Sequence, residues 1–318
     1  DMADTVTRMA PGELGPGDVE IHQGWSLRAH PPAPSAAPRA ADVLFLHGMG
    51  AGGWFWREDW RGVFARAGFG GWTITLPRTA AESRRGPDLD RLNRALLTGR
   101  AEDLLEVLTA HLPVASARSD PTLEDLTDAL EGALASIGRP VAVVAHSLGA
   151  AVAQNLLRRG GRPAATVLLC PVPPYGLWRA SLALAATDPR LWRALAALSV
   201  LGVAHADLAL LRQRLFPSGV AEAEFAELIG HLGDESLAVT LRARGVPPFA
   251  PLPGPRRDVL VIGGGRDALI PAADVWATAA WYGGLPRLLP GAGHLPTFEP
   301  GAPALAAEIA RWIARRTA

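Results

Sequence analysis

Short, continuously apolar runs separated by polar turns recur along the chain and restrict its fold more than any other feature. Runs of this kind have the length of strands, and a strand that is apolar on both faces is typical of a parallel sheet covered by helices. An earlier segment, residues 19–27, alternates apolar and polar residues and predicts a hairpin that turns near Gln23-Gly24. The apolar runs are residues 43–46, 72–76, 141–145, 166–170, 259–262 and 285–289.

Helical patterns lie between these predicted strands. Apolar residues recur at helical spacing from Leu123 to Ile137, directly after Asp120-Pro121, a pair typical of a helix start. A final helix has an apolar face from Leu305 to Ile313. The alternation predicts an α/β fold: a doubly wound, mostly parallel eight-stranded sheet flanked by helices.

Two long segments interrupt this alternation. Residues 84–119 form a polar, Arg-rich insertion with an amphipathic helix around Leu104. Residues 171–256 form a helical excursion with prolines at both ends, which we expect to be a cap (lid) over the carboxyl edge of the sheet, where ligands bind. The core domain then comprises residues 1–170 and 257–318.

Composition excludes several classes of protein. The 49% of hydrophobic residues exclude a disordered chain. The 31 basic and 31 acidic residues give no net positive charge, which argues against a nucleic-acid-binding protein. Cys170 is the only cysteine, so there is no intrachain disulfide, and no Cys/His cluster has the spacing of a metal site. No apolar run is long enough to cross a bilayer, and the first residues do not resemble a signal peptide. We therefore expect a cytoplasmic protein without an integral membrane segment.

The strand at residues 141–145 runs directly into a helix through His146-Ser147-Leu148. Small residues stand on both sides of Ser147, at Ala145 and Gly149, which is the pattern of a nucleophile elbow with alanine in place of the first glycine. The cramped turn of such an elbow requires small neighbours, and the helix that follows directs free N–H groups towards developing negative charge. The alternative is a serine that only caps a helix.

A nucleophilic serine needs a base, and the base needs a group that orients it. His294 stands in a glycine-bounded turn after the last predicted strand, and Asp267 follows the strand at residues 259–262. The alternatives are an exposed loop histidine and an aspartate that bonds its own turn. The order Ser147, Asp267, His294 is the one expected for an elbow-bearing sheet, and it favours a catalytic set.

Residues 43–50 place a strand before His47-Gly48-Met49, where the Met49 N–H could pair with that of Leu148 to bind an oxyanion. The same segment contains the glycine pattern of a dinucleotide-binding loop. That interpretation requires an acidic residue at the end of the second strand, and residues 75–78 contain none.

Four motifs together resemble the α/β-hydrolase family with a helical cap, and its esterase-like and lysophospholipase-like members. They are Leu46-His47-Gly48, the Ala145–Gly149 elbow, Gly265-Arg266-Asp267 and Gly293-His294. The resemblance extends from about residue 18 to near the end of the chain. It implies Ser147 as nucleophile, His294 as base, Asp267 as orienting acid, and the Met49 and Leu148 amides as oxyanion donors, without a cofactor. Residues 78–83 and the insertion after them depart from the family pattern.

These features predict a serine hydrolase that cleaves a carboxylic ester of a small, mostly apolar molecule through an acyl-enzyme. Aromatic residues beside the predicted site, Trp54, Phe55 and Trp178, are expected to contact the substrate. The same residues would also serve a C–C hydrolase, thioesterase, lyase or perhydrolase, because fold does not fix chemistry. A non-catalytic binder of small molecules is the alternative from another class.

Overall fold

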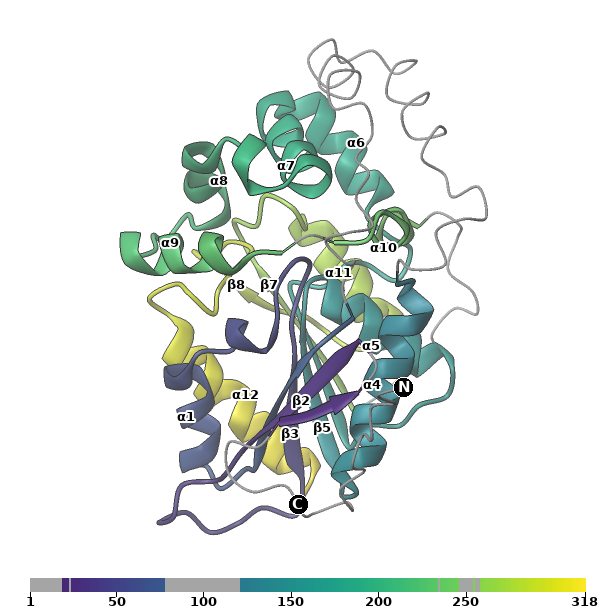
Figure 1. Cartoon of the computed structure of the whole chain (residues 1–318), viewed down its shortest axis with the longest axis vertical. Helices are drawn as coiled ribbons and strands as arrows, with labels where there is room; N and C mark the ends of the chain where they lie inside the picture. The colour runs from purple at the N-terminus through teal and green to yellow at the C-terminus, as the bar shows by residue number, and fades with distance from the viewer. Residues whose placement is uncertain (1–18, 23, 78–120, 234, 246–253, 255–257) are drawn as a thin grey trace, which may run out of the picture.

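The structure is a computed structural model that describes residues 19–22, 24–77, 121–233, 235–245, 254 and 258–318 (Figure 1). One eight-stranded sheet has the order β1-β2-β4-β3-β5-β6-β7-β8. The pairs β1-β2 and β2-β4 are antiparallel and all others are parallel, which confirms the predicted sheet. The strands are β1 (Val19–His22), β2 (Trp25–His30), β3 (Asp42–Leu46), β4 (Gly71–Thr75), β5 (Val141–His146), β6 (Ala165–Leu169), β7 (Val259–Gly264) and β8 (Arg287–Leu289).

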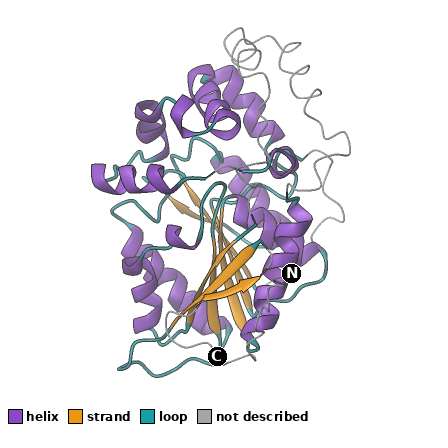
Figure 2. Cartoon of the chain, viewed as in Figure 1, coloured by secondary structure: helices purple, strands orange, loops and turns teal. Residues whose placement is uncertain are grey.

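Alternate residues of the central strands pack on opposite helical layers. Val43 and Phe45 lie in a cluster with α1 (Glu58–Arg66) and α12 (Ala302–Arg316). Leu44 and Leu46 lie in a second cluster with α4 (Leu123–Ile137), α5 (Leu148–Arg158) and α11 (Ala272–Trp281). The central strands β3, β5 and β6 are thus buried on both faces, which is why they are mostly apolar (Figure 2).

The start of α4 differs from the expectation. Thr122 is the N-cap: its side chain accepts a hydrogen bond from the Asp125 N–H, and the Asp125 carboxylate accepts one from the Thr122 N–H. This reciprocal capping box satisfies two free donors at once, so the helix begins after Pro121 rather than at it. Asp120, the predicted cap, lies outside the described residues, as does the segment 84–119.

Five α-helices of the described residues lie between β6 and β7, beyond the carboxyl ends of the central strands (Figure 1). We call them the helical layer: α6 (Trp178–Thr187), α7 (Pro189–Leu201), α8 (Leu208–Leu215), α9 (Glu222–His231) and α10 (Leu237–Ala243). A backbone hydrogen bond from Gly233 N, after α9, to Gly50 O (2.7 Å) joins the helical layer to the loop that follows β3. A second, from Leu177 N to Ala243 O (3.0 Å), joins the start of α6 to the end of α10. Among the described residues, no helix is long and apolar enough to cross a membrane.

Candidate active site

Ser147 occupies the sharp turn between β5 and α5. Its φ of 53° is in the left-handed region, which is strained for a residue with a side chain. The turn brings α5 so close to β3 that a Cβ on Gly149 would lie 2.3 Å from the His47 carbonyl oxygen. Although Ser147 is the N-cap of α5, its side chain makes no capping hydrogen bond. The structure therefore argues against a serine that only caps the helix.

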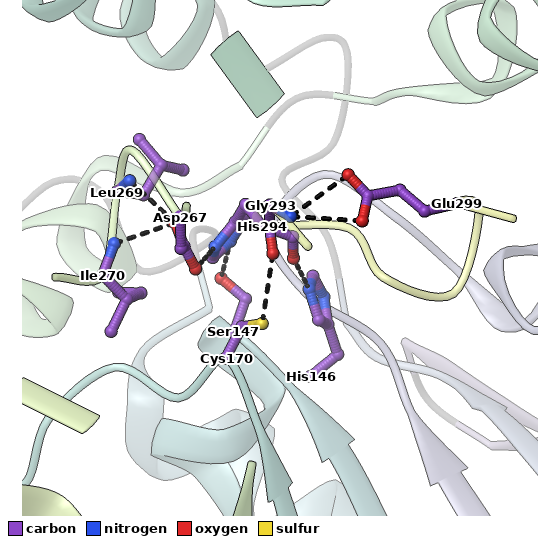
Figure 3. Close-up of polar contacts among 9 residues, drawn as sticks. All are labelled: His146, Ser147, Cys170, Asp267, Leu269, Ile270, Gly293, His294 and Glu299. Atoms are coloured by element: carbon purple, nitrogen blue, oxygen red, sulfur yellow. Dashed lines mark hydrogen bonds and ion pairs between the residues drawn. The ribbon is translucent and has the colours of Figure 1, made fainter. Parts of the chain in front are cut away.

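Three side chains predicted from separate parts of the sequence form one chain of hydrogen bonds (Figure 3). His294 Nε2 lies 2.9 Å from Ser147 Oγ, and His294 Nδ1 lies 2.8 Å from Asp267 Oδ2. A carboxylate can only accept, so Nδ1 carries the proton and Nε2 is left to accept the serine hydroxyl. In this tautomer the imidazole is arranged to remove a proton from Ser147.

Backbone amides fix the Asp267 carboxylate. Its Oδ1 accepts hydrogen bonds from the N–H groups of Leu269 (2.8 Å) and Ile270 (3.0 Å), in the loop between β7 and α11. The turn interpretation of this aspartate is thus correct for one oxygen, while the other oxygen is directed at His294. One carboxylate performs both tasks.

Sequence reasoning missed Glu299, which holds the loop that carries His294. Both of its carboxylate oxygens lie 3.1 Å from the Gly293 N (Figure 3). Its Oε1 also accepts a hydrogen bond from Ser218 N at 3.5 Å. Burial raises the pKa of Glu299. A Cβ on Gly293 would lie 2.4 Å from the Leu215 carbonyl oxygen, so this position requires glycine. The only sequence signal for Glu299 is its place five residues after His294.

His146 supports the same loop from below. Its Nε2–H donates to the His294 carbonyl oxygen at 2.8 Å, and its ring stacks on Phe55. Burial lowers the pKa of His146 to about 3, so the imidazole is neutral at physiological pH. His146 therefore braces the backbone of His294 and does not act as a second base.

Cys170, His146 and His294 offer ligand atoms within 4.8 Å of one another, which raises the question of a metal. Two of these groups are already engaged: His294 bonds Ser147 and Asp267, and His146 bonds a carbonyl. Burial raises the pKa of the Cys170 thiol well above its ordinary value, which disfavours the thiolate that binds metal. The arrangement does not suit a metal ion.

The loop after β3 lies directly against Ser147. A Cβ on Gly48 would lie 3.2 Å from Ser147 Cβ, and the loop is braced by His47, whose Nδ1–H donates to Gly48 O while its Nε2 accepts from Leu76 N. Leu148 is the first residue of α5, so its N–H has no acceptor within the helix. Met49 and Leu148 both line the cavity next to Ser147.

A mostly apolar cavity of about 110 Å³ opens between Ser147 and the helical layer. It is small beside the pockets of drug-sized ligands. Its lining residues are Met49, Ser147, Leu148, Val172, Leu177, Ala180, Ser181, Leu184, Trp192, Leu195, Ala196, Ser199, Thr240, Ala243, Arg244, Leu269, Ile270 and His294.

The three predicted aromatic contacts are not among the described residues that line this cavity. Phe55 is only 2% exposed, because the short 3-10 helix Gly53–Phe55 turns its ring into the core against His146 and Phe298. Trp54 packs on His231 of α9, and Trp178 is 50% exposed at the start of α6. The apolar wall is made instead by leucines of the helical layer and by Trp192.

The sequence profile of the alpha/beta hydrolase family matches residues 43–307. The chain belongs to the α/β-hydrolase family. No curated protein matches the sequence.

Three solved structures are similar to this chain. A thermophilic esterase from Thermogutta terrifontis has 18% identity and a TM-score of 0.57, covering 97% of this chain and 98% of its own. The N-acyl homoserine lactonase AidH has 16% identity and a TM-score of 0.58, and the match covers 92% of this chain and 93% of the lactonase chain. A bromoperoxidase from Bacillus anthracis has 15% identity and a TM-score of 0.56, and the match covers 93% of this chain and 96% of the bromoperoxidase chain. At these identities the similarity establishes the fold.

Proposed function

We propose that this α/β hydrolase is a serine esterase that cleaves small carboxylic esters through an acyl-enzyme. The observation that carries the proposal is the hydrogen-bond chain from Ser147 Oγ through His294 to Asp267, at 2.9 and 2.8 Å, at the edge of a cavity. A serine without a base is a weak nucleophile, and this chain supplies both the base and the group that orients it.

The mechanism uses the residues of the chain alone. His294 Nε2 takes the hydroxyl proton as Ser147 Oγ attacks the ester carbonyl, and the imidazolium then protonates the leaving alcohol. The Met49 and Leu148 amides hold the oxyanion, and Asp267 stays ionised and stabilises the imidazolium. Water, activated by His294, then releases the acid and restores the serine. No step requires a cofactor.

Ester chemistry is favoured by the cavity and by the relatives. Apolar side chains surround Ser147, which suits a short acyl chain better than a polar sugar or a peptide. An esterase and a lactonase, which opens a cyclic ester, are among the similar structures. A bromoperoxidase is also among them, and it keeps a reaction other than ester hydrolysis as the second candidate.

We further propose that residues 171–256 act as a cap over the core formed by residues 1–170 and 257–318. Residues 171–256 supply most of the apolar wall of the cavity, including Leu177, Leu184 and Leu195, and none of the reacting groups. This division suits a cap that selects the acyl group.

Hydrolysis of p-nitrophenyl butyrate tests the proposal. Ser147→Ala is expected to lower kcat by about a thousandfold or more, because no other group replaces the hydroxyl, while the circular dichroism spectrum stays unchanged. The exposed Ser35→Ala is the matched control and should keep the wild-type rate. Activity of Ser147→Ala within tenfold of the wild type would refute the assignment.

A further inference from the structure

Arg244 lies at the wall of the mostly apolar cavity and carries a positive charge there. It lines the cavity together with Ser147 and His294, and it is half-buried. Within the part of the chain that the structure describes, its guanidinium has neither a hydrogen-bond acceptor nor an acidic partner. Burial lowers the pKa of Arg244, but an arginine remains protonated at physiological pH.

Neighbouring arginines do have such partners. Arg242, two residues earlier, lies 3.9 Å from the Glu124 carboxylate, and Arg158 donates to the Pro174 carbonyl oxygen at 2.8 Å. Withdrawing a charge from water without a partner is costly, so buried cations are ordinarily paired. Arg244, which is half-buried, has no such partner among the described residues at the wall of the cavity that holds the reacting serine.

The backbone of Arg244 is held firmly in place. It follows the last residue of α10, whose carbonyl accepts a hydrogen bond from Leu177 N at 3.0 Å. Gly176 has a φ of +84°, and a Cβ there would lie 2.6 Å from the Arg244 carbonyl carbon. The chain before α6 and the end of α10 are therefore packed backbone to backbone, and the guanidinium extends from a fixed point.

We propose that Arg244 binds a carboxylate of the substrate, so that the preferred ester is an apolar chain that carries a carboxylate at its far end. This inference rests on the proposed esterase function. The planar guanidinium pairs with a carboxylate through two parallel hydrogen bonds, and one cation balances one monoanion. A phosphate, close to a dianion at neutral pH, would keep an unbalanced charge in this apolar wall. The leucines that line the same cavity suit a methylene chain.

Matched ester pairs test the proposal and show which side of the ester carries the charge. Monomethyl adipate is compared with methyl hexanoate, and 6-acetoxyhexanoate with hexyl acetate. In at least one pair, kcat/KM is expected to be about tenfold or more higher for the charged ester. Arg244→Gln should lower the value for that ester by about 30-fold or more and change its neutral counterpart less than about threefold. Arg244→Lys should restore part of the loss.

Arg242→Gln is the control, because it removes a cation only two residues from Arg244, and Arg242 is not among the residues that line the cavity. This variant should leave the preference for the charged over the neutral ester unchanged. Shorter and longer diacid monoesters, from succinate to suberate, extend the first series. The proposal is overturned if neutral esters are cleaved better in both pairs, or if Arg244→Gln affects charged and neutral esters equally.

Binding separates this inference from the proposed function. Titration calorimetry on Ser147→Ala, with hexanoate and with uncharged hexanamide, reports on Arg244 without turnover. Hexanoate should bind about tenfold or more tighter than hexanamide, and the added Arg244→Gln substitution should remove the difference. Equal binding of the two ligands would refute the role of Arg244 even in an active esterase. Failure of the wild type to cleave any ester would refute the proposed function and leave the binding test decisive for Arg244.

Discussion

The edge of the sheet and the helical layer above it line the same cavity, but they are held in different ways. At the edge, Asp267, His294 and Ser147 are each fixed by backbone hydrogen bonds or a strained turn, and His294 is only 5% exposed. In the helical layer, α6 buries a single residue, Ala180, and exposes Trp178 and Leu182. Changes at the edge should therefore affect the chemistry, whereas changes in the layer should affect which ester is chosen.

Asp267→Asn should produce the largest loss of rate among variants that keep the serine. The asparagine amide can donate to His294 Nδ1, which places the imidazole proton on Nε2 and removes the base. The expected fall in kcat is on the order of 10⁴-fold. Steady-state hydrolysis of p-nitrophenyl butyrate measures it.

Asp274→Asn provides the control, because Asp274 is buried in α11 and accepts a hydrogen bond from the Tyr175 hydroxyl, outside the cavity lining. Its rate should stay within about threefold of the wild type. An Asp267→Asn enzyme that retains more than a tenth of the activity would place the orienting acid elsewhere.

Glu299→Ala tests whether the edge depends on a residue that touches no substrate. Without the carboxylate that accepts from Gly293 N, the loop loses the brace beside His294. We expect kcat to fall about 10- to 100-fold with KM within about twofold, and Glu299→Gln, which keeps an acceptor, to recover part of the rate. Glu308→Gln, which breaks a surface ion pair with Arg287, should change kcat less than twofold. Equal loss from all three variants would contradict a positioning role.

Leu184→Ala tests the other side of the comparison. Leu184 lines the cavity, so its truncation enlarges the pocket and should raise the ratio of octanoate to butyrate hydrolysis by about fourfold or more, one buried methylene being worth about 0.8 kcal/mol. Trp178→Ala, on the exposed start of α6, should leave this ratio within twofold. A panel of p-nitrophenyl esters from acetate to dodecanoate measures both. A ratio that changes in Trp178→Ala and stays constant in Leu184→Ala would instead support the sequence-based assignment of Trp178 as a substrate contact.

Acid stability reports on the packing below the reacting groups. The pKa of His146 is about 3 in the folded protein, against 6.5 for a free imidazole, so between these values the unfolded chain binds the extra proton. The free energy of unfolding must then fall as the pH is lowered through this range. His146→Asn should reduce the slope by about 1.4 kcal/mol per pH unit between pH 6 and 4. Urea unfolding measures the slope, and the exposed His205→Asn should leave it unchanged.

The sequence predicts the sheet and the three central residues because both follow from local patterns. Apolar runs define the strands, and parallel strands bring their carboxyl ends, with Ser147, Asp267 and His294, to one edge. The sequence predicts that Phe55 contacts the substrate, but a bulky ring beside a site motif can turn either way, and here a 3-10 helix turns it into the core. Arg244 is 97 residues from Ser147 and marked by no motif, so only the packing of α10 brings it to the cavity.

Labelling with a fluorophosphonate tests the central claim most directly, because the reagent reacts with a serine only where a base and an oxyanion site activate it. Intact mass should show one adduct per wild-type chain, and peptide mapping should place it on Ser147. Ser147→Ala should remain unmodified, and Asp267→Asn should react far more slowly. An unmodified wild type, or an adduct on another residue, would contradict the assignment of Ser147 as the nucleophile.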